Sequence, residues 1–238
     1  MWCFLLAVLL VLACATGAGA GPIEDVESAY RRGDYALAAK LLSPLAEQGY
    51  ATSQYNLGLL YYNGQGIPQD FQAALKWFRK AADQGNAEAL TKSGRMYSLG
   101  QGVPQDYQAA MKWYRKAAEQ GNAEAQSKLA GMYANGQGAL QDYQAAMKWY
   151  RKAAEQGNAE ALANLGVMYF NGMGIPQDII RGHMWFKVAA ETISDDNMVK
   201  APSIQYRDLS ASQMTPEQIN KAQEMARRCQ DTKFKECE

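Results

Sequence analysis

Residues 105–125 read QDYQAAMKWYRKAAEQGNAEA, and residues 141–161 repeat the same 21 letters 36 positions later. Single residues recur with this period across a longer stretch. They are Trp77, Trp113, Trp149 and Trp185; Tyr61, Tyr97, Tyr133 and Tyr169; and Gly49, Gly85, Gly121 and Gly157. Chance does not produce such a repeat, so the chain contains four units, which we place at 49–84, 85–120, 121–156 and 157–192.

Each unit is predicted to form two helices. In the second unit Asn86 is a candidate N-cap for the first helix, and apolar residues then follow at helical spacing. The string LGQGVP at 99–104 breaks that helix, Asp106 caps the next one, and Gly121 ends it. The glycines of this string follow no strand and precede no Gly-Lys-Ser/Thr, so they indicate a turn between helices rather than a phosphate loop.

The repeat also predicts how the helices pack. The tenth position of each unit is small, which lets the paired helix approach closely; it is occupied by Gly58, Gly94, Ala130 and Gly166. Trp113 and Trp149 widen the apolar stripe of the second helix, so we expect them to be packed between successive units. The fold class is therefore all-α, a solenoid of helix pairs.

The repeated motifs resemble those of the Sel1-like repeat family, a branch of the tetratricopeptide-type helical repeats. The resemblance rests on LGVMYFNGMGIPQD at 165–178 and on AAMKWYRKAAEQG at 109–121 and 145–157, and it covers residues 49–192. It implies right-handed stacking of helix pairs into a curved α/α superhelix, of a kind that serves as an adaptor holding proteins together. Some cysteine-rich secreted relatives are linked to β-lactams, but they carry a cysteine pair in every unit, which this chain lacks.

The flanks are predicted to cap the solenoid, since repeat arrays need polar ends to stay soluble. Residues 21–48 hold a shorter helix pair that looks like a degenerate tetratricopeptide unit. Residues 193–202 form a polar linker, and 203–212 are a possible helix. Thr215-Pro216-Glu217-Gln218 is a strong helix start, with an N-cap, proline at the first position and glutamine at the third.

Residues 1–20 are predicted to be a secretory signal peptide. An apolar run from Trp2 to Ala15 precedes the small-residue pattern Ala18-Gly19-Ala20, with cleavage expected after Ala20. Two alternatives remain: a lipoprotein signal acylated at Cys14, although Leu12 stands where that pattern prefers a small residue, and an uncleaved anchor. No transmembrane segment is expected in the mature chain, which we place in the periplasm or outside the cell.

The mature chain keeps two cysteines, Cys229 and Cys237, and in an oxidising compartment they are a disulfide candidate. Eight residues of continuous helix rise about 12 Å, whereas bridged Cα atoms lie within about 7 Å of each other. The last helix must therefore stop near Cys229 and the chain must fold back. Two free thiols on a frayed tail are the alternative.

Composition excludes several classes of function. Lys plus Arg equals Asp plus Glu, at 24 each, which argues against a nucleic-acid binder. The sequence shows no catalytic serine motif, no Cys-x-x-Cys and no His-Glu-x-x-His, so we predict no enzyme activity, cofactor or metal. His183 is the only histidine; it replaces Leu75, Met111 and Met147 of the other units, and we interpret it as a packed, hydrogen-bonded residue rather than a catalytic one.

Positions that vary between the units gather on one face of each first helix, at spacing i, i+4, i+7. In related tetratricopeptide repeats this face lines the concave groove. The predicted partner-binding residues are Tyr55, Asn56, Leu59, Tyr62, Lys92, Arg95, Lys128, Asn164, Val167 and Phe170. Such a groove has apolar ends and a basic centre, which suits a peptide with apolar anchors and an acidic group. The alternative is that these are tolerant solvent positions.

Three functions compete at this level. The first is a protein–protein interaction scaffold of the bacterial cell envelope that binds a protein or peptide partner. The second is a glycan or peptidoglycan-binding module with Tyr55, Tyr62 and Phe170 as stacking platforms, and the third is an enzyme acting on β-lactams or cell-wall material. The repeat tryptophans lie on the packed second helices, which weakens the second, and the third lacks an identifiable nucleophile.

Overall fold

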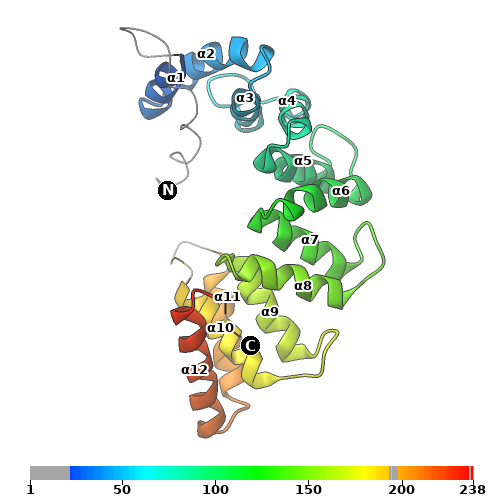
Figure 1. The fold of residues 1–238 in the computed structure, drawn as a ribbon, viewed down its shortest axis with the longest axis vertical. Helices are drawn as coiled ribbons and strands as arrows, with labels where there is room; N and C mark the ends of the chain where they lie inside the picture. Colours follow the sequence, from blue (N-terminus) through cyan, green and yellow to red (C-terminus); the bar gives the residue numbers. More distant parts are fainter. Residues whose placement is uncertain (1–21, 193, 195–197, 236, 238) are drawn as a thin grey trace. The chain divides into compact units, whose positions relative to one another are not determined.

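A computed structural model describes residues 22–192, 194, 198–235 and 237, so the predicted signal peptide and Cys14 lie outside the described part. All regular secondary structure in this part is helical (Figure 1), which confirms the predicted all-α class. The helices are α1 (Pro22–Arg31), α2 (Tyr35–Glu47), α3 (Ala51–Asn63), α4 (Phe71–Asp83), α5 (Ala87–Leu99), α6 (Tyr107–Glu119), α7 (Ala123–Asn135), α8 (Tyr143–Ala154), α9 (Ala159–Asn171), α10 (Ile179–Thr192), α11 (Lys200–Ala211) and α12 (Pro216–Asp231).

The chain divides into two compact units, Met1–Gln105 and Asp106–Glu238, which are called the first and second unit from here on. The 36-residue units of the sequence are called repeats. In the first unit α1 to α5 pack against one another in chain order. In the second unit α6 to α10 do the same, and α11 and α12 both pack against α10. Consecutive helices are thus neighbours in each unit, as a helix-pair solenoid requires. The division between the units falls in the loop between the two helices of the second predicted repeat.

The predicted caps are present and explain where the helices begin. The side chain of Asn86 accepts a hydrogen bond from the Ala89 amide at 2.8 Å, and that of Asp106 accepts one from the Ala109 amide at 2.9 Å. The same arrangement recurs one period later, at Asn122 and Asp142. Each cap satisfies an amide that would otherwise lack a partner in the first turn.

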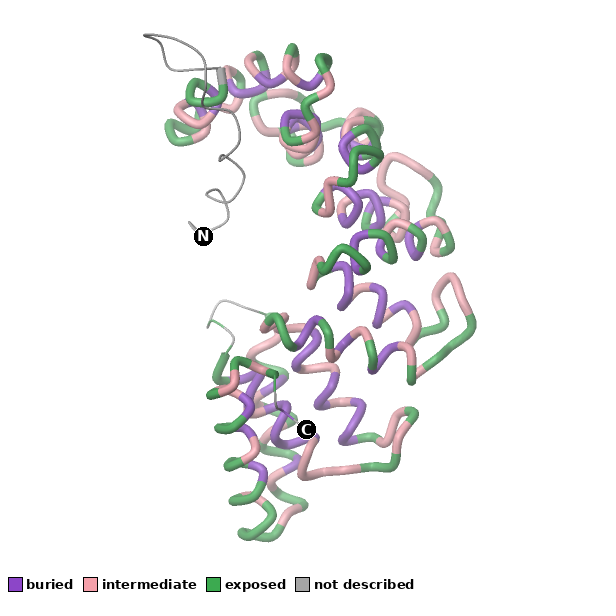
Figure 2. Tube along the Cα trace, in the orientation of Figure 1, coloured by how far each residue is buried: buried purple, intermediate pink, exposed green. Residues whose placement is uncertain are grey.

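The core is built from the faces that the helices turn toward one another (Figure 2). Leu57, Leu60 and Phe78 are fully buried in the first unit, and Leu129, Leu162 and Leu165 in the second. A Cβ atom added to Gly58 would lie 2.7 Å from the ring of Phe78, and one added to Gly166 would lie 2.6 Å from the ring of Phe186. The small tenth position therefore allows the close approach that the sequence predicted.

A second contact joins successive repeats. The loop glycine Gly102 lies against the backbone of Phe71, and Gly138 lies against the backbone of Tyr107, so each loop packs on the start of a second helix 31 residues earlier. A Cβ at Gly138 would be 2.5 Å from the Tyr107 carbonyl oxygen, and the residue has φ of +79°. Both the backbone conformation and the space thus require glycine there.

The C-terminal helices follow the prediction with small differences. Thr215 caps α12 with a complete capping box, because its side chain accepts from Gln218 N and Gln218 Oε1 accepts from Thr215 N. The helix continues to Asp231, two residues beyond the predicted end at Cys229. The possible helix at 203–212 is α11, which starts three residues earlier than expected.

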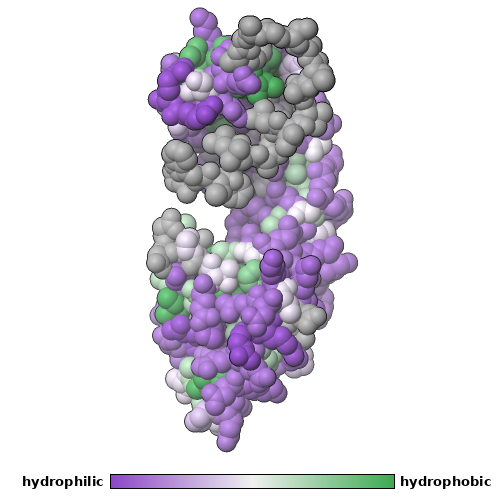
Figure 3. Space-filling model, turned by 60° about the vertical axis from the view of Figure 1, so that its left-hand side comes forward, coloured by the Kyte–Doolittle hydropathy of each residue, from purple (hydrophilic) through white to green (hydrophobic). Residues whose placement is uncertain are grey.

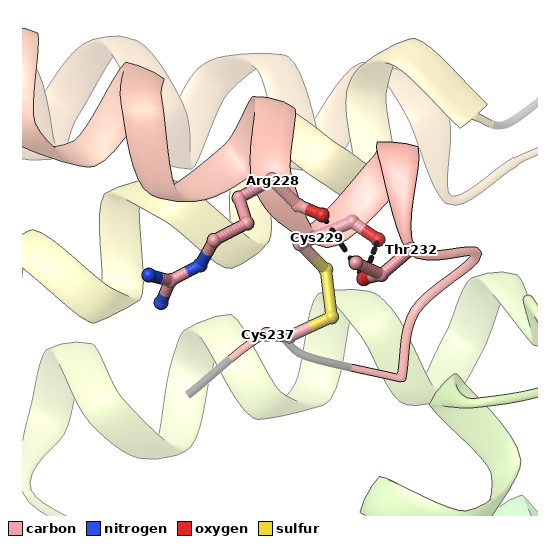
Figure 4. The surroundings of a disulfide bond; sticks show 4 residues. All are labelled: Arg228, Cys229, Thr232 and Cys237. Carbon is pink, nitrogen blue, oxygen red and sulfur yellow. Dashed lines mark hydrogen bonds between the residues drawn. A yellow bond between two sulfur atoms is a disulfide. The ribbon is translucent and has the colours of Figure 1, made fainter.

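Cys229 and Cys237 are joined by a disulfide, with their Cα atoms 4.3 Å apart (Figure 4). The hydroxyl of Thr232 donates to the carbonyl oxygens of Arg228 and Cys229, which closes the end of α12. Lys233 and Phe234 then have φ of 53° and 66°, and the chain turns back. The ring of Phe234 reaches Gly157 in the turn between α8 and α9. The tail therefore packs against the hydrophobic cluster formed by α8, α9, α10 and α12.

Candidate functional site

The first-helix face of the first unit carries an aromatic patch, which we define as Tyr55, Leu59 and Tyr62 of α3. All three are half-buried. The rings of Tyr55 and Tyr62 lie 5.8 and 6.3 Å from that of Phe78, and the Tyr62 hydroxyl donates to Gln101 Oε1 at 2.9 Å. These contacts hold the rings in place while part of each side chain remains open to solvent.

Two cations stand on the next first helix. Arg95 is exposed and Lys92 half-buried, both on α5. α5 shares a hydrophobic cluster with the aromatic patch through Met96 and Tyr97, so α3 and α5 both pack on α4. In the part of the chain that the structure describes, no carboxylate pairs with either cation. The first unit therefore combines a partly open aromatic patch with uncompensated positive charge on the neighbouring helix, and the half-buried Asn56 lies beside the patch.

The corresponding face of the second unit differs in its electrostatics. Lys128 Nζ of α7 lies 2.6 Å from Glu160 Oε2 of α9, with the two side chains 38% and 40% exposed. The positive charge of Lys128 is therefore matched within the protein, unlike that of Arg95. The expectation of a basic centre formed by Lys92, Arg95 and Lys128 thus loses one of its three members.

The expected apolar end at α9 is only partly present. Asn164 and Val167 are half-buried, but Phe170 is 9% exposed and belongs to the core. Its ring lies 6.2 Å from that of Phe186, and Gly182 of α10 lies against the backbone and Cβ of Phe170. The prediction that Phe170 lines an open face was therefore wrong, because its ring packs against Phe186 of the paired helix α10.

The repeat tryptophans are not equally buried. Trp77, Trp113 and Trp149 are half-buried, and the ammonium groups of Lys80, Lys116 and Lys152 lie 4.4, 5.2 and 4.7 Å from their ring centroids. Trp185 is only 2% exposed, and Val188 stands where the other repeats have that lysine. The expectation that Trp113 and Trp149 are fully packed between repeats was thus wrong. Each of these rings is half-buried and carries the ammonium group of the lysine three residues later over it.

A hydrogen bond between an arginine and a tyrosine joins successive repeats and was not predicted from the sequence. Arg115 of α6 donates to the hydroxyl of Tyr133 of α7 at 2.7 Å, and Arg151 of α8 donates to that of Tyr169 of α9 at 2.9 Å. Both pairs are 18 residues apart, so the recurring Arg–Tyr spacing was the available signal. These invariant tyrosines hold consecutive repeats together.

The titratable groups indicate structural roles. His183 is buried, and its Nδ1 lies 3.1 Å from the Arg207 carbonyl oxygen, which confirms a packed and hydrogen-bonded histidine. Burial raises the pKa of Tyr30 to about 12 and also raises that of Tyr150, so both hydroxyls stay neutral.

Within the described residues no group of three His, Cys, Asp or Glu side chains is placed to hold a metal ion. None of the described helices is both long and apolar enough to span a membrane.

Comparison with known proteins places this geometry in a family. The Sel1 repeat model matches residues 27–50, 51–86, 87–122, 123–158 and 159–191, well over half of the chain. The matched frame starts two residues later than the predicted units, and it includes part of the segment that we had predicted as a degenerate tetratricopeptide pair. A search of curated proteins gave no match.

Two solved structures support the assignment. The structure of c5321, a protective antigen present in uropathogenic Escherichia coli strains that displays an SLR fold, is 28% identical with a TM-score of 0.80, over 92% of this chain and 47% of that one. The present chain thus spans about half the length of that antigen. A Sel1 repeat protein from Oxalobacter formigenes is 31% identical with a TM-score of 0.70, over 88% of this chain and 89% of its own. The chain belongs to the Sel1 repeat family.

Proposed function

We propose that this protein is a non-enzymatic scaffold of the bacterial cell envelope that binds a peptide segment of a partner protein on the first-helix face of its first unit. The observation that carries the proposal is the aromatic patch of α3 together with the unpaired guanidinium of Arg95 on α5, the first helix of the next repeat. Large apolar side chains that stay partly open on one face are a feature of interaction sites. A bound segment would place an apolar residue on Tyr55 and Leu59 and a carboxylate near Arg95.

The location in the envelope rests on the sequence of residues 1–20 and on the paired cysteines. A structural disulfide is stable in the periplasm or outside the cell and rare in the cytoplasm. We therefore propose export, with removal of the leader after Ala20. Mass measurement of the protein isolated from cells tests this directly, since cleavage there leaves Gly21 at the N-terminus.

A charge-reversal experiment tests the binding face. The immobilised chain is incubated with envelope extract as wild type, as Arg95→Glu and as Lys76→Glu, which makes the same charge change on an exposed residue of the second helix α4. We expect a partner that is captured by wild type and Lys76→Glu and is lost with Arg95→Glu, with a larger loss at low salt because surface charges are then screened least.

The outcomes separate the candidate functions. Equal capture by all three proteins would remove the α3–α5 face as the site. Retention of the wild type on purified peptidoglycan, unaffected by Arg95→Glu, would favour a glycan-binding module instead. Repeating the capture with Tyr55→Ala then shows whether the aromatic patch takes part.

A further inference from the structure

Helix α11 packs on α10 through both apolar and polar contacts. Its two buried side chains are serines, Ser203 and Ser210, and Ser203 Oγ donates to the Val199 carbonyl oxygen rather than to another helix. Tyr206 stacks on Phe186 of α10 with ring centroids 5.2 Å apart, yet it remains 39% exposed. Leu209 is 46% exposed, and the face of this unit seen in Figure 3 is mostly hydrophilic with scattered hydrophobic patches. Apart from the half-buried Ile204 and the Tyr206–Phe186 stack, α11 therefore removes little apolar side chain from solvent.

His183 of α10 supplies a polar anchor for this helix. Its Nδ1 lies 3.1 Å from the Arg207 carbonyl oxygen and 2.9 Å from Ser210 Oγ, both on α11. Because a carbonyl only accepts, Nδ1 carries the hydrogen, and the Ser210 hydroxyl donates to the same carbonyl at 2.7 Å. A charged imidazole would need a second proton, on Nε2.

The other three repeats have an apolar residue at this position. Leu75, Met111 and Met147 are all buried, as is His183. The exchange of an apolar residue for histidine occurs in the repeat whose second helix carries α11. The histidine thus stands in the repeat where this position contacts an additional helix, α11, through hydrogen bonds.

From this geometry we propose that α11 is an acid-sensitive latch, held on α10 while His183 is neutral and released when the ring becomes protonated. The ring is 4% exposed, so a positive charge there would be largely removed from water. Release of α11 would uncover the ring of Phe186, on which Tyr206 stacks. Phe186 occupies the same position of its repeat as Phe78, and the aromatic patch of the first unit packs on Phe78.

The groups around His183 act on its pKa in both directions: the hydrogen bond to the Arg207 carbonyl oxygen raises it, whereas nearby cations lower it. Arg207 of α11 and Lys187 of α10 disfavour a second positive charge, while Asp208 of α11 favours it but is paired with Arg207 at 2.7 Å. α9 and α12 also pack on α10, and within the described residues neither contributes a charged group that acts on the ring. Burial is the largest cause that lowers the pKa of His183 from 6.5. Below pH 6.5 the released state therefore binds more protons than the docked state, and acid favours release.

Hydrogen exchange of the purified chain at pH 7.5 and pH 5.0, corrected for the intrinsic pH dependence of exchange, measures the latch. One group can change the opening equilibrium by at most tenfold per pH unit below its free pKa, so we expect peptides from residues 200–211 to open more often at pH 5.0 than at pH 7.5, by at most about thirtyfold. Peptides from α9, residues 159–171, serve as the internal control and should change little.

His183→Met is the matched variant, since methionine is the natural residue of the second and third repeats. It should abolish the pH dependence of α11 exchange, whatever the absolute protection of the helix. Because His183 is the only histidine, its pKa is also measured without ambiguity by NMR of the wild type. A pKa at or above 6.5, or α11 protection that is the same at both pH values, would overturn the proposal even if the variant folds poorly.

Discussion

Lys128 of α7 and Glu160 of α9 form an ion pair of 2.6 Å that joins two successive first helices of the second unit. The predicted basic centre of the binding face therefore contains a cation that already has a partner. Arg95 of α5 is exposed and has no carboxylate partner in the described part of the chain. The first unit, rather than the second, offers free positive charge to a ligand.

This ion pair should contribute little to stability. Both side chains are more than one third exposed, so solvent screens their attraction, and exposed pairs contribute about 0–1 kcal/mol. We expect Lys128→Met and Glu160→Gln, alone and combined, to give a coupling free energy below about 1 kcal/mol in urea unfolding. Partner capture by Lys128→Met should equal that of wild type. If capture falls as much as with Arg95→Glu, the binding face extends onto α7.

The tryptophans should differ in their contribution to folding. Trp185→Ala removes a side chain that is 2% exposed and should cost about 3–5 kcal/mol of unfolding free energy. Trp113→Ala removes a half-buried ring and its contact with Lys116, so its cost should be clearly smaller. Chemical denaturation of the two variants gives the comparison. Equal losses would show that Trp113 is packed as tightly as the sequence pattern first indicated.

Substitutions at two glycines distinguish the cost of backbone strain from the cost of a steric clash. Gly121 and Gly138 both have positive φ, of 91° and 79°, but a Cβ at Gly121 meets nothing within 4 Å while one at Gly138 would lie 2.5 Å from the Tyr107 carbonyl oxygen. Gly121→Ala should therefore cost only the conformational penalty of about 1–2 kcal/mol. Gly138→Ala should cost more, because the loop must also move away from α6. Thermal unfolding of both variants checks the order, and an equal effect would mean that the loop contact is unimportant.

The disulfide between Cys229 and Cys237 should stabilise the C-terminal cap. It closes a short loop, for which the expected gain is about 2–3 kcal/mol. The double variant with both cysteines changed to alanine should expose the tail first, so proteolysis should cut after Lys233 or Lys235 before the rest of the chain is attacked. Mass spectrometry of non-reduced protein taken from cells provides the independent check. Two alkylatable thiols in that material would contradict the bridge.

The local structure followed from the sequence because each local signal had one physical solution. Asn86 and Asp106 cap helices where predicted, and the small tenth position accepts the facing ring. Thr215 begins α12 with the predicted capping box. These features depend on neighbours within a few residues or one period away, and the 36-residue repeat shows each of them several times.

The candidate site was less predictable because exposure depends on what packs over a residue. Tyr62 and Phe170 occupy the same position of the repeat, yet Tyr62 is half-buried and Phe170 is in the core. The helix α10 lies close to α9 here, with Gly182 against the backbone and Cβ of Phe170 and the ring of Phe186 against that of Phe170. Periodicity places a residue on a face but does not state how closely the paired helix covers that face.

The sequence by itself determined the all-α fold, the period, the residues that cap the helices and the start of the last helix at Thr215, since all of these rest on local chemistry. Tertiary structure alone decided that Lys128 is matched by Glu160, that Arg115 bonds Tyr133, and that the single histidine holds α11. Such pairs join side chains that are 18 to 32 residues apart, and their distances depend on how helices stack. A contact of this kind exists only once packing has set the spacing between helices. The recurring Arg–Tyr spacing of 18 residues is visible in the sequence, but it does not state that the two side chains meet.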